Sequence, residues 1–233
     1  MAENDSYQQE ITWLKGGQPY IVCAYFTSNY LEEIKSLNAS LVALNINHYI
    51  YPHEDLGYWE KNTRAKPAFI LKCLDQFPNH HIVYTDADSV FRKNPELFEK
   101  ITEDIAIFKA PDKSGYFTHD YLTSTVYFNN NETSRTLLRQ WIDEQNAGAL
   151  QVDQDSFDIA VKKIPSLTIY NLPFSYVKIF DQNETVEPVI EHFQASRKQV
   201  KLKNHVRRWR NRIFGLLVLL LLAWIFYVMF FGS

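Results

Sequence analysis

The sequence has 233 residues, of which 46% are apolar and 15% aromatic, with a formal net charge of −3. At roughly 100–200 residues per domain it has room for one full domain and a short appendage, and its composition excludes a disordered or fibrous chain. Its two cysteines exclude a disulfide framework and a four-thiolate zinc site. Residues 1–196 hold 16 basic and 27 acidic side chains, a net charge of −11 that argues against nucleic-acid binding.

The first ninety residues alternate strands with helices. An apolar run predicts a buried strand at 20–26, and apolar residues at helical spacing predict a helix over 29–37. A second strand at 48–51 precedes a helix over 66–77, which has a proline in its first turn, where the missing N–H is tolerated. A third strand is expected at 81–85. This alternation favours an α/β fold with parallel strands.

Downstream the pattern becomes mixed. Strands are predicted at 105–108, 125–128 and 189–193, and helices at 134–144 and 153–162. The soluble part is therefore expected to be one α/β domain with a mixed central sheet.

The last segment is uncharged and almost wholly apolar. Residues 213–231 (IFGLLVLLLLAWIFYVMFF) form a run of about 28 Å as a helix, close to the ~30 Å hydrocarbon core of a bilayer. A buried core helix is the alternative, but a helix that is apolar all round needs protein on every side. A single-pass transmembrane helix is therefore predicted here.

The segment at 197–212 holds eight Lys or Arg residues and no acid. By the positive-inside rule this basic juxtamembrane segment places the domain at 1–196 in the cytosol, anchored by its C-terminal helix. The arginines nearest the helix are expected to meet anionic lipid headgroups: Arg207, Arg208, Arg210 and Arg212. The glycosylation sequons at Asn38, Asn131 and Asn183 are then expected to be accidental.

Two carboxylates follow the third predicted strand. In HIVYTDADSVF, residues 81–91, Asp86 and Asp88 stand at the carboxyl end of the strand, where open α/β sheets bind ligands. Residues two apart on extended chain point the same way, so both can bind one cation. Oxygen ligands of this kind suit Mg²⁺ or Mn²⁺ bridging a diphosphate. A solvated acidic turn is the alternative, because D-x-D is common by chance.

Two later segments add polar groups. In QVDQDSFDIA, residues 151–160, Asp153, Gln154 and Asp155 open the predicted helix, although Asp is also an ordinary N-cap. In VIEHFQASRK, residues 189–198, His192 stands at a strand end and Lys198 follows six residues later. Each signal is weak alone, since a single His is usually structural and Lys198 can belong to the basic segment.

The sequence resembles the nucleotide-sugar-dependent glycosyltransferases of the GT-A fold. The resemblance lies in three motifs in a fixed order: D-x-D after a strand, D-Q-D on a helix, and a late His-Phe with Lys six residues after the His. The similarity covers about residues 19–198 and is closest to glycosyltransferase family 8 and related retaining enzymes. It implies a GT-A, Rossmann-like domain, Mn²⁺ or Mg²⁺ as cofactor, and a nucleoside-diphosphate sugar as donor, with UDP-sugar favoured and GDP-sugar possible.

The resemblance also implies residue roles. Asp86, Asp88 and His192 match the metal ligands, and Lys198 matches a lysine that contacts the diphosphate. Asp153 and Gln154 match the pair beside the anomeric carbon. The other donor-binding positions are Ala24, Tyr25 and Thr27 after the first strand, Lys66 on the helix before D-x-D, Asp86 itself, and Ser124 and Thr125. The last two belong to the segment Thr123-Ser124-Thr125, which stands where the family has N-x-G. The sequence departs from the family at Ala195, which replaces a Gly, and at Gln199 and Val200, which replace Pro-Trp.

The stereochemistry stays open. A retaining enzyme would have Asp153 or Gln154 on the sugar face opposite the leaving diphosphate, which is the outcome that the resemblance implies. An inverting enzyme needs a carboxylate base, for which Asp155 or Asp120 is available. The anchor points to a lipid-linked, lipopolysaccharide-type or other membrane-bound saccharide as acceptor, because tethering raises its effective concentration.

Two alternatives remain. DADSV also fits the D-x-D-x-[TV] pattern of haloacid-dehalogenase-like phosphatases, but it begins at residue 86 and no G-D-x-x-x-D follows. The second alternative is a catalytically silent, membrane-anchored protein that binds a nucleotide sugar. Metal-dependent nucleotide binding without transfer would distinguish it from an enzyme.

Overall fold

The computed structural model describes residues 9–57, 59–111, 118–148, 153–182 and 185–195, together with Trp209 and Phe214. The chain divides into two compact units, residues 1–193 and 194–233. Within the described ranges, no helix combines the length and the apolar character needed to span a bilayer. The membrane helix predicted over 213–231 lies outside these ranges except for Phe214, so it stays a prediction, as do the boundaries of the domain and of the basic segment.

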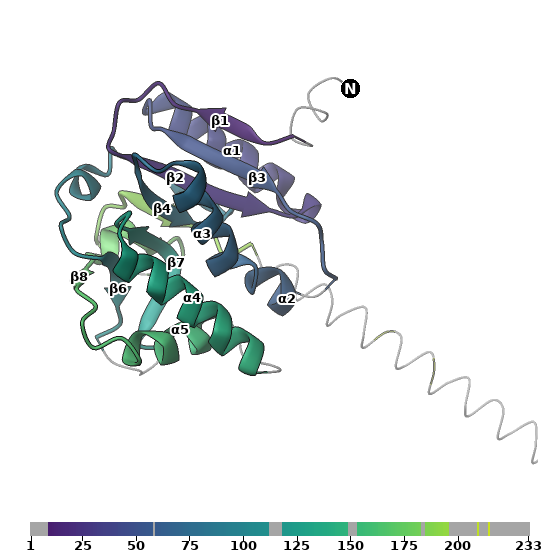
Figure 1. Ribbon diagram of the computed structural model, residues 1–233. Helices are drawn as coiled ribbons and strands as arrows, with labels where there is room; N and C mark the ends of the chain where they lie inside the picture. Colours follow the sequence, from purple (N-terminus) through teal and green to yellow (C-terminus); the bar gives the residue numbers. More distant parts are fainter. Residues whose placement is uncertain are drawn as a thin grey trace, which may run out of the picture. The chain divides into compact units, whose positions relative to one another are not determined.

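The first unit alternates strands and helices as far as α3 and then becomes mixed (Figure 1). Its strands are β1 (Ile11–Trp13), β2 (Tyr20–Phe26), β3 (His48–Pro52), β4 (His81–Thr85), β5 (Ser89–Phe91), β6 (Ile105–Lys109), β7 (Tyr121–Phe128), β8 (Ile169–Asn171), β9 (Lys178–Ile179) and β10 (Ile190–His192). Its α-helices are α1 (Leu31–Ala43), α2 (Trp59–Thr63), α3 (Lys66–Gln76), α4 (Glu132–Ala147) and α5 (Asp153–Lys162), and its 3-10 helices are η2 (Ser28–Tyr30), η3 (Glu96–Glu99) and η4 (Phe174–Tyr176).

Seven strands form the central sheet in the order β1-β3-β2-β4-β7-β6-β8. Strand β2 runs parallel to β3 and β4, whereas β7 is antiparallel to both β4 and β6. The predicted mixed sheet is confirmed. Strand β1, which the sequence pattern did not predict, adds an antiparallel edge beside β3.

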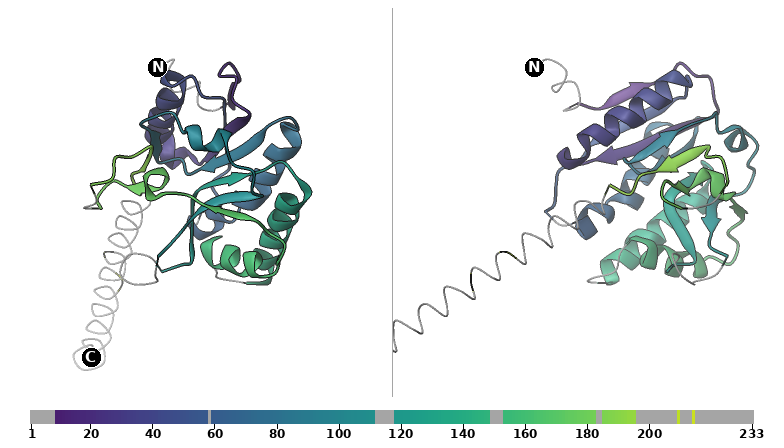
Figure 2. Two further views of the ribbon diagram at one scale, coloured as in Figure 1. Left: turned by 90° about the vertical axis from the view of Figure 1, so that its left-hand side faces the viewer. Right: turned by 180° about the vertical axis from the view of Figure 1, so that it is seen from behind.

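Helices cover both faces of this sheet, which explains why every residue of β2 is buried. Alternate side chains of β2 enter different cores: Val22 belongs to a cluster that includes Leu37 of α1, whereas Ile21 belongs to a cluster that includes residues of α3, α4 and α5. Figure 1 shows α3, α4 and α5 on the near face, and Figure 2 shows α1 on the opposite face. The two free cysteines, Cys23 and Cys73, are buried in the second core.

A second, three-stranded sheet has the order β5-β10-β9. In it β10 pairs antiparallel with β5, with His192 opposite Ser89, and parallel with β9, with His192 opposite Ile179. This small sheet brings the end of the first unit back to the segment that follows β4.

Two of the three sequons have structural partners. The Oδ1 of Asn131 accepts a hydrogen bond from the backbone N–H of Ser134 at 2.9 Å and thereby caps α4. The Oδ1 of Asn38 lies 2.9 Å from Nε2 of the buried His48. Asn183 lies outside the described residues.

Candidate active site

The two aspartates of D-x-D lie in a tight turn between β4 and β5. Strand β4 is buried and ends at Thr85, and the backbone N–H of Asp86 then donates to the carbonyl of Ser124 on β7 at 2.9 Å. The N–H of Ser89 donates back to the carbonyl of Asp86 at 3.2 Å. The turn is therefore fixed by backbone hydrogen bonds on both sides, and both aspartates in it are only half-buried.

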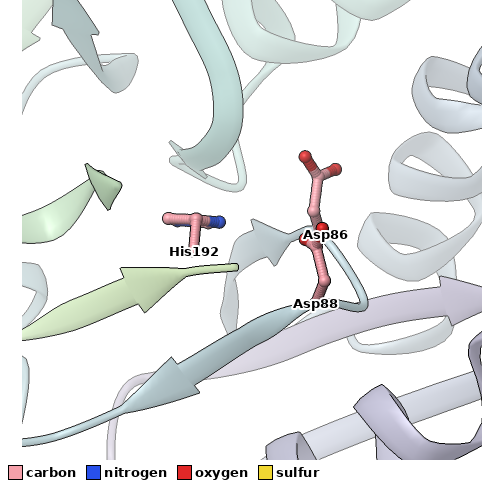
Figure 3. Close-up of side chains that lie close together, drawn as sticks. All are labelled: Asp86, Asp88 and His192. Carbon is pink, nitrogen blue, oxygen red and sulfur yellow. The ribbon is translucent and has the colours of Figure 1, made fainter. Parts of the chain in front are cut away.

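His192 reaches the same place from β10. The N–H of Phe193 donates to the carbonyl of Asp88 at 3.0 Å, and Oγ1 of Thr125 lies 2.9 Å from Nε2 of His192. One potential ligand atom from each of Asp86, Asp88 and His192 lies within 4.8 Å of the other two. Figure 3 shows the imidazole directed toward the two carboxylates. The structure brings the predicted metal ligands together, while their role as ligands stays a prediction.

The chemistry of these three side chains fits a divalent cation. Burial and the nearby Lys66 ammonium lower the pKa of His192 to about 3, so the imidazole is neutral at pH 7 and keeps a lone pair for a metal. Its Nδ1 is buried and has no hydrogen-bond partner within the described part of the chain. Two carboxylates and one neutral imidazole form a donor set that suits Mn²⁺ or Mg²⁺.

Lys66, at the start of α3, lies beside this cluster and is 3% exposed. Its Nζ is 2.5 Å from Oδ2 of Asp153 and 3.3 Å from Oδ1 of Asp86, and it donates to the carbonyl of Thr123 at 3.1 Å. Burial favours the neutral amine, but the carboxylates of Asp153 and Asp86 outweigh it and raise the pKa of Lys66. Lys66 therefore joins the D-x-D turn to the first residue of α5 through a charged contact.

Asp86 also accepts a hydrogen bond from the hydroxyl of Tyr84, two residues earlier on β4, at 2.9 Å. Burial and the carboxylate of Asp153 raise the pKa of Asp86, although Lys66 and Tyr84 act in the opposite direction. Its side chain is still 35% exposed, so it remains accessible to a ligand.

Asp153 is held in place by both its side chain and its backbone. Its Oδ2 accepts a hydrogen bond from Oγ1 of Thr123 at 2.9 Å. Its carbonyl accepts from Nε1 of the buried Trp141 and from Oγ of Ser156, both at 2.9 Å. Gln154, the next residue, is only half-buried. Asp153 therefore fixes the start of α5, whereas the side chain of Gln154 is less buried than that of Asp153.

The proposed bases of an inverting mechanism have partners of their own. Oδ1 of Asp155 lies 3.3 Å from Nδ1 of His119, and Oδ2 of Asp120 lies 3.4 Å from Nζ of Lys162. Neither carboxylate is among the three residues that the structure groups around the D-x-D turn.

The remaining predicted donor-binding residues fall into two groups. Ala24 and Tyr25 lie within β2 rather than after it, and only Thr27 follows the strand. Ala24 and Thr27 are buried, and Tyr25 donates its hydroxyl hydrogen to the carbonyl of Asn62 at 2.8 Å. On β7, Ser124 holds the backbone of Asp86 and Thr125 contacts His192, as described above. Lys198 lies outside the described residues.

Three residues at the site were not predicted from the sequence. Tyr84 donates a hydrogen bond to Asp86, and His119 pairs with Asp155. Tyr30 is the third: burial and then the carboxylates of Asp88 and Asp86 raise its pKa. Only Tyr84 carries a local signal, since it precedes Asp86 by two residues on extended chain and so faces the same side.

A family model for nucleotide-diphospho-sugar transferases matches residues 59–204, more than half of the chain. The chain belongs to this family. The predicted nucleotide-sugar-dependent glycosyltransferase is thereby confirmed, whereas membership of glycosyltransferase family 8 stays a prediction. The family match also favours a transferase over the phosphatase alternative. No curated protein matches the chain in sequence.

Solved structures with a similar fold include further glycosyltransferases. One is involved in the glycosylation of the major capsid of PBCV-1; it is 12% identical, the match covers 76% of this chain and 94% of that one, and the TM-score is 0.55. Another is GlyE of Streptococcus pneumoniae TIGR4, 14% identical, with 76% of this chain and 55% of that one covered and a TM-score of 0.54. At these identities the matches support the GT-A fold alone, and the aligned part spans about half of GlyE.

Proposed function

We propose that this enzyme is a metal-dependent glycosyltransferase that moves a sugar from a nucleoside-diphosphate donor, a UDP-sugar in the first instance, to a membrane-associated saccharide in glycan biosynthesis. The observation that carries the metal dependence is the convergence of Asp86, Asp88 and His192 within 4.8 Å. A divalent cation held by these residues would offset the charge that develops on the departing diphosphate.

The residues around the cluster fit the donor end of such a reaction. The Asp153 carboxylate forms an ion pair with Lys66 and accepts a hydrogen bond from Thr123, so its position is fixed. It can orient a sugar only from that position. Gln154 is less buried and follows on the same helix end, where it is the freer of the two to approach the anomeric carbon. We therefore propose retention, with Gln154 beside the face opposite the leaving diphosphate.

Retention and inversion make different demands on Asp155. An inverting reaction needs a base that removes the acceptor proton, and Asp155 with His119 is the candidate pair. NMR of the product made from an α-linked UDP-sugar tests the proposal: an α-linked product supports retention. A β-linked product, together with loss of turnover in Asp155→Asn, would assign the reaction to the inverting class.

The proposed acceptor and location rest on the sequence of the second unit. The basic segment at 197–212 followed by the apolar run at 213–231 supports a single-pass anchor with the catalytic domain in the cytosol. A domain held at the membrane surface meets lipid-linked saccharides at high effective concentration. Anionic headgroups would bind the basic segment.

The donor and the anchor can be tested separately. A panel of UDP-, GDP- and dTDP-sugars, assayed for hydrolysis and transfer with Mn²⁺ and with EDTA, tests the metal and the donor; EDTA-resistant turnover would contradict the proposal. Metal-dependent nucleotide binding without turnover on any acceptor would indicate the silent binding protein instead. Full activity on lipid-linked acceptor in vesicles after deletion of residues 200–233 would contradict the role of the anchor.

A further inference from the structure

The ammonium of Lys66 is a fixed positive charge beside one of the predicted metal ligands. Its Nζ lies 3.3 Å from Oδ1 of Asp86, and the side chain is only 4% exposed. The same Oδ1 also accepts a hydrogen bond from the hydroxyl of Tyr84 at 2.9 Å. A divalent cation that binds Asp86 must therefore share this carboxylate with a cation that the protein already supplies.

The contact with Asp153 keeps Lys66 in the site. At 2.5 Å this ion pair is shorter than the contact with Asp86, and the carbonyl of Thr123 adds a hydrogen bond at 3.1 Å. Lys66 can thus lose its contact with Asp86 and still have partners nearby. It cannot move far, because α3 begins at this residue and its side chain is enclosed.

The charges at the site predict how Lys66 affects the binding of a divalent cation. Asp86, Asp88 and Asp153 supply three negative charges, and Lys66 offsets one of them, so it weakens the attraction for a free divalent cation. Like charges a few ångströms apart repel strongly in a partly dehydrated site. A nucleoside diphosphate brings further negative charge, which attracts both the ammonium and the cation and removes the penalty of placing them together.

We propose that Lys66 is a tethered counter-ion that competes with the divalent cation for Asp86, so that the cation binds tightly only together with the nucleoside diphosphate. This inference rests on the proposed function, in which a cation and the donor diphosphate share the site. It makes Lys66 a positioning residue for metal binding, in addition to the donor contact that the sequence predicts.

Calorimetry with Mn²⁺, alone and in the presence of UDP, tests the proposal on the full chain. For the wild type we expect UDP to tighten Mn²⁺ binding by about tenfold or more, and Mn²⁺ to tighten UDP binding by the same factor. Lys66→Met should bind Mn²⁺ alone about tenfold more tightly than the wild type and lose most of this coupling. Lys66→Arg, which keeps the charge, should resemble the wild type.

Lys72→Met is the matched control, because Lys72 is an exposed lysine on the same helix, with its ammonium over the ring of Tyr51. It should leave Mn²⁺ affinity unchanged. A Lys66→Met variant that binds Mn²⁺ more weakly or with unchanged affinity would overturn the inference, since Lys66 would then merely support Asp86. If that variant does not fold, equal Mn²⁺ affinity of the wild type with and without UDP would overturn it. Failure of the wild type to bind Mn²⁺ under either condition would instead contradict the proposed function.

Discussion

Ser89 and His192 lie directly opposite each other in the antiparallel pairing of β5 with β10. Because Asp88 immediately precedes Ser89, this register sets the imidazole next to the acidic pair. Side chains on a strand alternate between two faces, so a slip of one residue would turn His192 away from Asp86 and Asp88. The third predicted metal ligand is thus positioned by strand pairing between segments far apart in the chain.

Replacement of Asp88 by Asn should abolish tight Mn²⁺ binding in the presence of UDP and lower turnover by about 100-fold or more, because a neutral amide is a poor substitute for a carboxylate at a divalent cation. Calorimetry and initial rates measure the two effects. Circular dichroism should show an unchanged fold, since Asp88 is only half-buried. Asp75→Asn, at an exposed residue paired with Arg135, is the control for loss of a surface charge; equal effects of the two changes would argue against the metal site.

Thr125→Val removes the hydroxyl that lies 2.9 Å from Nε2 of His192 but keeps the shape of the side chain. We expect Mn²⁺ affinity to fall by about 10- to 100-fold, as is typical when a residue that orients a metal-bound histidine is lost. Melting temperature and Mn²⁺ titration together separate this effect from unfolding. Unchanged Mn²⁺ affinity in a folded variant would show that Thr125 does not orient the imidazole.

Trp141→Phe should destabilise the fold and the start of α5. The indole N–H of this fully buried residue donates to the carbonyl of Asp153 and to Oγ of Ser156, so the variant removes one of the two donors to the Asp153 carbonyl, and Ser156 remains as the other. We expect a loss of about 1–3 kcal/mol in the free energy of unfolding, measured in urea, together with a lower kcat.

Trp13→Phe is the matched control for this change. Nε1 of Trp13 has no hydrogen-bond partner among the residues that the structure describes, so the control loses ring area without losing a hydrogen bond. It should cost less stability and leave kcat unchanged. An equal fall in kcat for both variants would rule out a specific role for the Trp141 hydrogen bonds.

Asp104 should make stability depend on pH. Burial would raise its pKa, but hydrogen bonds from Thr168 and from the side chain of Asn131 outweigh burial and lower it. The Thr168 N–H and hydroxyl both donate to Oδ2 at 2.8 Å. A depressed folded-state pKa means that ionised Asp104 stabilises the fold above its unfolded pKa of about 3.9, and that this contribution is lost as pH falls through the folded value.

Asp104→Asn should therefore lower the free energy of unfolding by roughly 1–2 kcal/mol at pH 7. The difference from the wild type should shrink as pH falls below about 4, because Asp104 then gains a proton in the unfolded chain while the folded carboxylate, with its lowered pKa, gains one only at lower pH. Urea denaturation across a pH series measures it. A difference that stays constant down to pH 2 would contradict this assignment.

The longer elements could be predicted because their signals are local. Helix α5 begins and ends where the sequence pattern placed it, and β4 likewise, since apolar periodicity and a terminal acidic residue mark them. Strand β7 begins at Tyr121, four residues earlier than predicted, because Thr123 and Ser124 interrupt the apolar pattern. The Thr123 side chain bonds instead to Asp153. Strands β1, β8 and β9 have two or three residues each and form only through distant partners, so no local pattern reveals them.

The site could be predicted in part. The resemblance identified Asp86, Asp88 and His192, which the structure brings together, yet their proximity depends on a small sheet that the sequence does not reveal. The ion pair of Lys66 with Asp153 joins residues from separate helices, and nothing in either segment indicates that the two would neutralise each other.

The late position of β10 in the first unit has a consequence for synthesis. The two aspartates leave the ribosome more than one hundred residues before the imidazole, so a nascent chain carries the acidic turn for most of its growth without the histidine that completes the cluster. The three side chains can therefore come together only after β10 has been synthesised and has paired with β5.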